Sequence, residues 1–380
     1  MKAALALLLA LTSVASAQES PVDYASDAKA LDKIIVENYA YEDHWPGGVL
    51  PDSPQLAAAR GAVHDRDSLL HYAEDRIASL ADHHAITGSS FKDSWAIIPT
   101  YADLWVVRRG GQYLIEAVRE GSPAEKVGIA AGDNLIAVGE VPTQQAVETF
   151  WKSMGLQVTP ERADYAARVL AAGRRDRPRD LTITHGGGSR RVSLPNLYTD
   201  QPDRPLLTVT DRVIRFNNSL GDQGTIEAFD KAMAAVPRNA PVVLDFSDTP
   251  SGGNTSVARA IMGWFIDRPR SYQVHNLPAE ERETGIPRQW VEQVLPRAGK
   301  HHGILPVLRV GRWTGSMGEG LAIGFAALGA RVEGTRMAQL KGAVYDFALP
   351  SSGMTVKLPA ERLYSVDGRA REDFVPAAIR

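Results

Sequence analysis

Cysteine is absent from this chain of 380 residues. Without it the protein cannot have a disulfide scaffold, a thiol nucleophile or a cysteine-ligated zinc or iron–sulfur site. An excess of charge of one sign is also lacking, because 42 basic and 45 acidic side chains leave a formal net charge of −3. That balance excludes a wholly basic protein that binds nucleic acid or a membrane surface. Hydrophobic residues at 44% and charged residues at 23% are typical of a globular chain.

Long hydrophobic runs are missing except at the start of the chain. Residues 1–17 read MKAALALLLALTSVASA, with one lysine, an apolar stretch and a small-residue site that ends at Ala17. This order predicts a secretory signal peptide cleaved after Ala17. A membrane anchor is the alternative, but a span requires about 20 apolar residues and this run is shorter. We therefore expect a periplasmic or secreted mature protein without a membrane span.

The remaining length predicts two or three domains at about 150 residues each. Residues 18–91 carry apolar positions at helical spacing and predict a helical segment. Residues 92–195 show short strand-like runs and glycine turns, with a mixed-charge stretch at 174–180 that predicts a solvated loop. Strands and helices alternate over residues 205–380, which is typical of an α/β layer architecture. Prolines and glycines within 276–303 predict an insertion or lid around a short helix.

The segment 113–141 reads YLIEAVREGSPAEKVGIAAGDNLIAVGEV. It predicts a strand, a short helix capped by Ser122 and ended by Gly128, and a tight turn into a second strand. This pattern resembles a PDZ domain. The resemblance implies a groove that adds a peptide strand to a sheet edge, with its carboxylate-binding loop near 101–105, so Trp105 is a candidate for substrate binding. A small β-domain that only spaces its neighbours is the alternative.

Two glycine-containing elements point to chemistry. The first reads LDFSDTPSGGN over 244–254, a buried strand that leads through Gly252 and Gly253 to a helix beginning near Asn254. Consecutive backbone amides at a helix start can bind a phosphate or an oxyanion. Neither phosphate-loop pattern, G-x-x-x-x-G-K-[ST] or G-x-G-x-x-G, is present. A purely structural strand-to-helix turn remains the alternative.

The second element reads WTGSMGEGLA over 313–322 and places Ser316 where a helix of small residues begins. The small neighbours leave room for a substrate, and the helix dipole favours developing negative charge. The segment differs from the G-x-S-x-G elbow of α/β-hydrolases. An ordinary helix N-cap is the alternative role for Ser316.

Together, the order of these segments resembles the carboxyl-terminal-processing (tail-specific) serine peptidases, and the motifs DTPSGGNT at 248–255 and E-G-T-x-M-A at 333–338 resemble a periplasmic branch of that family. The resemblance implies a crotonase/ClpP-like α/β core with an N-terminal helical segment and a PDZ-like β-rich domain. It further implies that Ser316 is the nucleophile and that Glu319 marks its helix. The implied oxyanion donors are the amides of Gly252, Gly253 and Met317.

The base is open between two arrangements. In the family's dyad branch a lysine follows the serine by 25 residues, and here that position is Lys341. Burial among apolar neighbours could make this lysine neutral, although the family's T-x-G-K context is missing. The tricorn-type branch instead pairs a histidine with a C-terminal glutamate. Glu372 falls where that glutamate would be, but the histidine position falls near Arg215, which cannot act as a base.

Histidine provides two further candidates. The D-x-H pattern of Asp82 and His84 resembles a family motif at the end of the helical segment, and we expect a structural hydrogen bond there. His301 and His302 lie in a loop without a third ligand, and no H-E-x-x-H spacing exists. We therefore predict neither a metal nor a cofactor.

The main hypothesis is a serine endopeptidase that hydrolyses polypeptides, which the PDZ-like domain engages. The alternative is a catalytically lapsed binding protein of the same fold, holding an apolar ligand or peptide in a groove walled by Trp264, Phe265 and Trp290. A hydrolase of small esters that uses the same serine is a third possibility.

Overall fold

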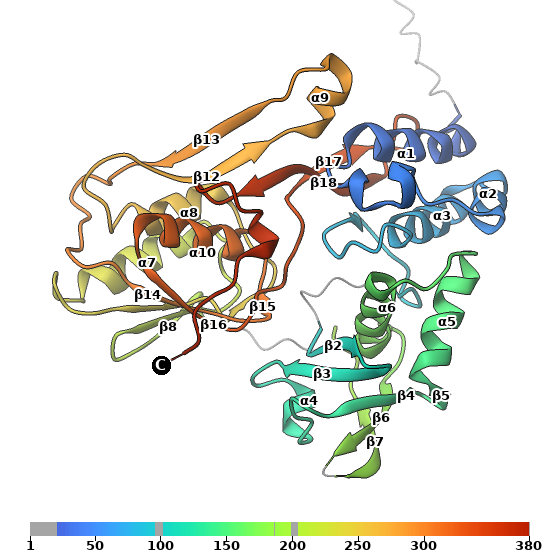
Figure 1. Ribbon diagram of the computed structural model, residues 1–380, viewed down its shortest axis with the longest axis horizontal. Helices are drawn as coiled ribbons and strands as arrows, with labels where there is room; N and C mark the ends of the chain where they lie inside the picture. Colours follow the sequence, from blue (N-terminus) through green and yellow to red (C-terminus); the bar gives the residue numbers. More distant parts are fainter. Residues whose placement is uncertain (1–20, 96–101, 186, 199–203, 380) are drawn as a thin grey trace, which may run out of the picture.

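The computed structural model describes residues 21–95, 102–185, 187–198 and 204–379. The predicted signal peptide and Tyr101 lie outside these residues. The architecture is mixed α/β with several sheets, and Figure 1 shows three regions in chain order from blue to red. Within the described residues, no helix has both the length and the apolar character required to cross a membrane.

The first region is helical, as predicted. Its helices are α1 (Tyr24–Asn38), α2 (Pro54–Gly61) and α3 (Arg66–Ala78). Asp23 caps α1 by accepting a hydrogen bond from the amide of Ser26, and Leu31 and Ile35 turn its apolar face inward. That face shares a core with C-terminal residues, among them Val356. The helical region is therefore held to the far end of the chain by a common apolar cluster.

The second region is an antiparallel sheet of six strands with two covering helices. Its elements are β2 (Leu104–Arg109), β3 (Gln112–Val118), α4 (Pro123–Lys126), β4 (Asn134–Val138), β5 (Val141–Pro142), α5 (Thr143–Ser153), α6 (Pro160–Ala172), β6 (Arg179–His185) and β7 (Gly188–Leu194). The order is β2-β3-β4-β6-β7, with β5 on β4. Ser122 caps α4 as predicted, by accepting from the amide of Glu125.

One loop prediction for this region is wrong in part. The end of the mixed-charge stretch 174–180 is not solvated, because Arg179 begins β6 and is buried. Its guanidinium forms a bidentate ion pair with the buried carboxylate of Asp103 at 2.7 and 2.8 Å. A buried arginine requires such a partner, and the charge pattern alone did not reveal it.

The third region contains a mostly parallel sheet in the order β16-β14-β10-β9-β8, of which only β8 runs antiparallel. Its elements are β8 (Leu207–Thr210), β9 (Val213–Phe216), α7 (Gly224–Ala234), β10 (Val243–Asp245), α8 (Thr255–Met262), β14 (Val307–Val310), α10 (Met317–Leu328) and β16 (Arg331–Gly334). The buried strand predicted before the glycine loop is β10, which spans only three residues. Asn254 caps α8.

A second sheet covers the opposite side of α10. It has the order β1-β18-β12-β13, with β17 on β18. Its strands are β1 (Ile86–Thr87), β12 (Arg270–Asn276), β13 (Gln289–Val294), β17 (Ala343–Ala348) and β18 (Thr355–Tyr364). Since α10 contacts β14 and β16 on one side and β12 on the other, it is buried along most of its length. This position explains its small and apolar side chains.

The stretch 276–303 is integrated into this second sheet. β13 pairs with β12 along its length, and α9 (Pro278–Thr284) joins the two strands. Figure 1 shows this hairpin reaching toward α1. At its tip Arg282 donates hydrogen bonds to the carbonyls of Glu37 and Tyr39 at 2.9 and 3.0 Å. The segment is thus a hairpin arm anchored to the helical region.

Candidate active site

The glycine loop and the candidate serine lie together because two short strands precede them. β11 (Asp248–Thr249) pairs in parallel with β15 (Trp313–Thr314). The hydroxyls of Thr249 and Thr314 both donate to the carbonyl of Phe246, at 2.9 and 2.7 Å. The chain segments that follow the two strands therefore leave the sheet at the same place.

Contact between these segments requires glycine at position 252. A Cβ on Gly252 would lie 2.4 Å from Cβ of Ser316 and 2.8 Å from the amide nitrogen of Met317. The residue also has φ of +63°, which L side chains rarely adopt. The loop backbone consequently lies directly against the start of α10.

Ser316 has an unusual backbone conformation. Its φ is +49° and its ψ is −112°, and its side chain region is only partly buried. Positive φ costs a non-glycine residue on the order of 1–3 kcal/mol, and such residues cluster at active sites. The conformation persists because the Ser316 amide donates to Oε2 of Glu319 at 3.0 Å and Gly252 packs against its Cβ.

Glu319 is completely buried and joins two segments. Its carboxylate accepts the amides of Ser316, Gln339 and Leu340, at 3.0, 2.8 and 3.1 Å. Burial raises its pKa to about 7, while the charge of Arg371 and these amides oppose that shift. The sequence predicted only a helix marker at this position. The structure shows a carboxylate that fixes the segment 339–341 beside the candidate nucleophile.

The three predicted oxyanion donors differ in availability. The amide of Gly252 donates to the carbonyl of Thr249 at 3.1 Å and closes a turn. The amides of Gly253 and Met317 have no acceptor among the residues that the structure describes. Met317 is buried and follows Ser316 directly, whereas Gly253 is exposed and follows the glycine that packs on Ser316. An amide without a protein acceptor can receive a negatively charged oxygen, so both remain candidate donors.

His84 reaches the same corner from the helical region. Its Nδ1 lies 2.6 Å from the carbonyl oxygen of Lys341. A carbonyl can only accept, so Nδ1 carries the hydrogen and Nε2 presents a lone pair. Burial lowers the pKa of this imidazole to about 4, so it is neutral near pH 7. Its amide donates to Asp82 at 2.9 Å, which confirms the structural hydrogen bond expected for the D-x-H pattern.

Lys341 is partly buried and turns toward the helical region. Its Nζ lies 5.6 Å from the centre of the Tyr41 ring, a cation–π contact that stabilises the charged ammonium. Its neighbour Leu340 is bonded through its amide to Glu319, as described above, and contacts Gly315. The main chain at 340–341 therefore links the nucleophile's helix to His84, whereas the lysine side chain is held by an aromatic ring.

Glu372 approaches this corner from the C-terminal end of the chain, in the turn η3 (Arg371–Asp373). The preceding Arg371 donates to the carbonyls of Leu340 and Gly342, both at 2.7 Å. Oε2 of Glu372 and the hydroxyl of Tyr41 are buried atoms without a hydrogen-bond partner in the described part of the chain. Burial and then the charge of Glu372 raise the pKa of Tyr41.

Trp105, predicted to bind substrate, is placed elsewhere. It is 1% exposed and packs edge-on against Trp313, with ring centres 6.3 Å apart. The guanidiniums of Arg168 and Arg312 lie 4.8 and 5.0 Å from its ring centre. It joins the second region to the core, so in this structure no substrate can contact it.

The groove expected for a binding protein is not walled by its three predicted aromatic residues. Trp264 and Phe265 are buried in the main core, and Trp290 stacks on His275 with ring centres 4.9 Å apart. His302 is likewise buried, with Nε2 2.9 Å from the carbonyl of Ala240. No group of three acidic or histidine side chains in the described ranges could hold a metal ion.

The other partner considered for a tricorn-type arrangement is Arg215. Its guanidinium donates to Glu120 at 2.6 Å, across the contact between the core and the second region. A tricorn-type arrangement would need a histidine at this position. Neither β9 nor the strands paired with it, β8 and β10, contain one. The signal that could have identified His84 was the D-x-H pattern, together with its place at the end of the helical region.

Comparisons with known proteins give a fold. No protein-family model matches the chain, and no curated protein matches it in sequence. Among solved structures, the photosystem II D1 C-terminal processing protease superposes with a TM-score of 0.55 at 14% identity, covering 94% of this chain and 93% of that one. Mature CPAF gives 0.57 at 15% identity and covers 93% and 92%. Its complex with lactacystin gives 0.58 at 15% and covers 93% of both chains. Over nearly its whole length, the chain thus has the fold of these proteases.

Proposed function

We propose that this protein is a serine endopeptidase that hydrolyses peptide bonds in polypeptides. The observation that carries the proposal is the contact between Gly252 and Ser316, because it sets unpaired amides beside a hydroxyl at a helix start. Ser316 Oγ attacks the scissile carbonyl carbon. The amides of Gly253 and Met317 then receive the oxyanion, and Gly252 contributes the close approach instead of a hydrogen bond.

We infer that His84 is the base, in preference to Lys341. A base must be neutral before it accepts a proton, and the imidazole of His84 is neutral with Nε2 as its lone pair. The Lys341 side chain instead lies over the Tyr41 ring, with Nζ 5.6 Å from the ring centre. The imidazolium that forms keeps its Nδ1–H bond to the Lys341 carbonyl. The carboxylate of Asp82 favours this charge, whereas the guanidinium of Arg371 opposes it.

Protons are conserved over the proposed reaction cycle. His84 takes the proton of Ser316 and returns it to the leaving amine as the carbon–nitrogen bond breaks, which leaves an acyl-enzyme. A water molecule attacks the acyl carbon, with His84 again as base, and the serine is regenerated as the carboxylate product leaves. Every step uses groups of this chain and water.

Polypeptide capture is assigned to the second region by its resemblance to a PDZ domain. β2 is an edge strand and α6 packs beside it, which is the arrangement in which a peptide strand is added to a sheet. The leader-like residues 1–17 support a periplasmic or secreted location. Mass spectrometry of the exported protein tests that location, since a mature N-terminus other than Gln18 would contradict cleavage after Ala17.

The reaction is tested with a fluorophosphonate probe and an unfolded protein substrate. The unaltered chain should be labelled and should release new peptide ends, and Ser316→Ala should do neither while it remains folded. Equal labelling of both proteins would overturn the assignment of Ser316. Turnover of nitrophenyl esters without peptide turnover would favour the small-ester hydrolase instead.

A further inference from the structure

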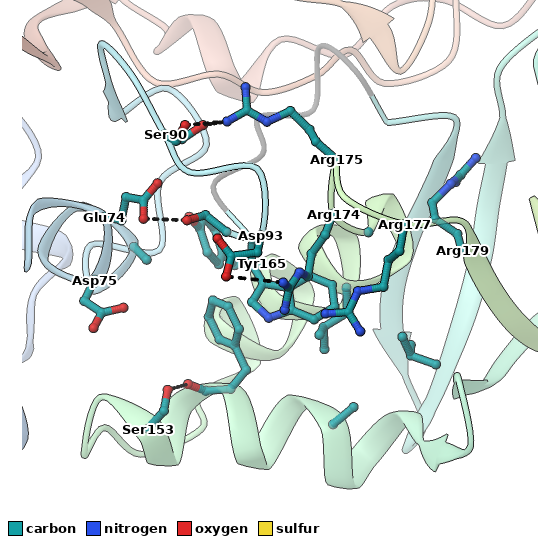
Figure 2. A pocket seen from close by; sticks show the side chains of 18 of the residues that line it. Glu74, Asp75, Ser90, Asp93, Ser153, Tyr165, Arg174, Arg175, Arg177 and Arg179 are labelled. Atoms are coloured by element: carbon teal, nitrogen blue, oxygen red, sulfur yellow. Dashed lines mark hydrogen bonds and ion pairs between the residues drawn. The ribbon is translucent and has the colours of Figure 1, made fainter. Parts of the chain in front are cut away.

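A cavity with a volume of about 1000 Å³ lies between the helical region and the second region (Figure 2). α3 and the segment that follows it form one wall. α5, the C-terminal end of α6 and the start of β6 form the other. None of Ser316, His84, Lys341 or Glu372 lines it. The cavity is therefore separate from the site proposed for hydrolysis, and its size reaches the upper end of the range of ~300–1000 Å³ typical of ligand pockets.

The wall formed by α3 is acidic. The carboxylate of Glu74 is already hydrogen-bonded within the protein. It accepts from the amide of Phe91 at 3.1 Å and from the hydroxyl of Ser94 at 2.6 Å. The side chain of Asp75 accepts no hydrogen bond and forms no ion pair within the described ranges, although His71 lies one turn earlier on the same helix. Desolvation raises the pKa of both carboxyls. Asp75 is exposed, and its carboxylate thus remains available to a ligand at this wall.

The opposite wall contains Asp180 and four arginines, and Asp93 from the facing loop lies 3.5 Å from one of them, Arg174. Arg174 holds Asp176 through two contacts, at 2.8 and 3.1 Å, and Arg175 donates to the carbonyls of Ser90 and Phe91 at 2.6 and 2.8 Å. Arg177 has only a 3.4 Å contact with Asp176, which it shares with Arg174, and its side chain is 57% exposed. Arg177 is therefore the guanidinium with the most capacity for another anion.

Aromatic side chains lie between these walls. Phe150 and Tyr165 both line the cavity, with ring centres 6.3 Å apart, and His83 stacks on Tyr165 at 4.3 Å. Figure 2 shows Tyr165 between Asp75 on one side and Arg177 on the other. The cavity thus has an anionic end, an aromatic middle and a cationic end.

From this arrangement we propose that the cavity binds a short zwitterionic peptide with an aromatic or aliphatic side chain. The peptide ammonium pairs with Asp75, its carboxylate pairs with Arg177, and its side chain packs against Phe150 and Tyr165. A purely anionic ligand would meet the Asp75 carboxylate, and a purely cationic one would meet the arginines. The proposal rests on the cavity alone and does not require the hydrolytic activity.

The test is calorimetric titration of the Ser316→Ala chain with the tripeptide Ala-Phe-Ala and with its N-acetylated and C-amidated forms. The serine variant prevents consumption of the probe, so a failure of the proposed peptidase activity would leave this result intact. We expect the free tripeptide to bind and each blocked form to bind about tenfold more weakly, since one charged contact is worth about 1.4 kcal/mol. Absence of binding, or equal binding of all three forms, would overturn the proposal.

Two variants assign the ends. Asp75→Asn should abolish the difference between free and acetylated tripeptide and leave the effect of amidation intact. Arg177→Gln should do the reverse. Lys33→Gln and Glu37→Gln, which remove exposed charges from α1 outside the cavity, are the matched controls and should leave all three affinities unchanged. If Asp75→Asn and Arg177→Gln each reduced binding of every form equally, the assignment of the two ends would be wrong.

Discussion

The two halves of the candidate active site are built differently. The nucleophile half consists of main chain, with Gly252 packed against Ser316 and a completely buried Glu319 bonded to three amides. The half with the proposed base depends on a side chain from a distant part of the chain, His84, which contacts the carbonyl of Lys341. The first half has few conformational alternatives. The second depends on tertiary packing and retains buried polar atoms without partners.

The two halves of the site have different tasks: one binds a developing negative charge and the other transfers a proton. Backbone donors and a tightly packed glycine can wait in place for a charge that appears only during reaction. A base must change charge in each turnover, so the charged groups around it affect how readily it accepts a proton. Substitutions in each half should therefore affect hydrolysis in different ways.

Removal of the nucleophile should have the largest effect. We expect Ser316→Ala to reduce the rate of peptide hydrolysis by about 10⁴-fold or more. Stability should change by at most ~1 kcal/mol, because positive φ is no more favourable for alanine than for serine. Steady-state hydrolysis and thermal unfolding measure the two effects. A variant that retained a tenth of the activity would exclude Ser316 as nucleophile.

Next, the two candidate bases can be compared directly. His84→Gln should lower kcat by about 10²–10⁴-fold, whereas Lys341→Met should lower it less than tenfold. The reason is that the Lys341 side chain contacts Tyr41, while its carbonyl, which His84 uses, is unaffected by the substitution. The reverse order of effects would restore the lysine of the dyad branch as the base.

Close packing of the glycine loop predicts a strong effect of one methyl group. Gly252→Ala should lower activity by about 100-fold, since its Cβ would lie 2.4 Å from that of Ser316 and one misplaced ångström costs about that much. Gly353→Ala is the matched control. It has a similar φ of +68° but open space around the new Cβ. If the positive φ alone caused the loss, both variants would lose fluorophosphonate labelling to the same extent. Equal labelling of Gly252→Ala and Gly353→Ala would therefore contradict the role of close packing.

The smallest effect concerns stability and pH. The pKa of Glu319 is raised from 4.5 to about 7, so the folded state holds its proton more tightly than the unfolded state. Its contribution to the free energy of unfolding is therefore present below pH 4.5 and declines as pH rises to 7, by up to about 3 kcal/mol. Glu319→Gln should remove this decline.

The comparison must be made between variants, because His84 acts in the opposite sense. Its pKa is lowered from 6.5 to about 4, so its contribution is lost as pH falls through this range. Denaturant unfolding of the unaltered chain and of Glu319→Gln from pH 4.5 to 7 isolates the glutamate. A difference in stability that does not depend on pH would contradict the raised pKa.

Some of this architecture could be predicted because it depends on local patterns. Apolar spacing predicted a helical first region, where it matches α1 and α3 but did not reveal α2, and the capping pattern around Ser122 placed α4. The apolar residues before the glycine loop predicted a strand, which the structure shows as β10. These features are encoded within a few residues, so no distant partner was needed to recognise them.

Other features depend on residues far apart in sequence. Trp105 is buried by contacts with Arg168, Arg312 and Trp313. Trp264 and Phe265, predicted to line a ligand groove, belong instead to the main hydrophobic core. The charge pattern of 174–180 did not predict the buried ion pair between Arg179 and Asp103. In each of these cases a side chain's environment is set by a partner dozens of residues or more away, which no local pattern describes.

Taken alone, the sequence determined the local chemistry of this protein: a serine at the start of a small-residue helix, a glycine pair after a buried strand, and helices with one apolar face. Only the tertiary structure decided which groups meet. It set His84 beside the main chain of Lys341, bound Glu319 to the segment 339–340, and enclosed a cavity with charges of opposite sign at its ends. The physical reason is that backbone geometry and capping act over a few residues, whereas burial and charge pairing act through space.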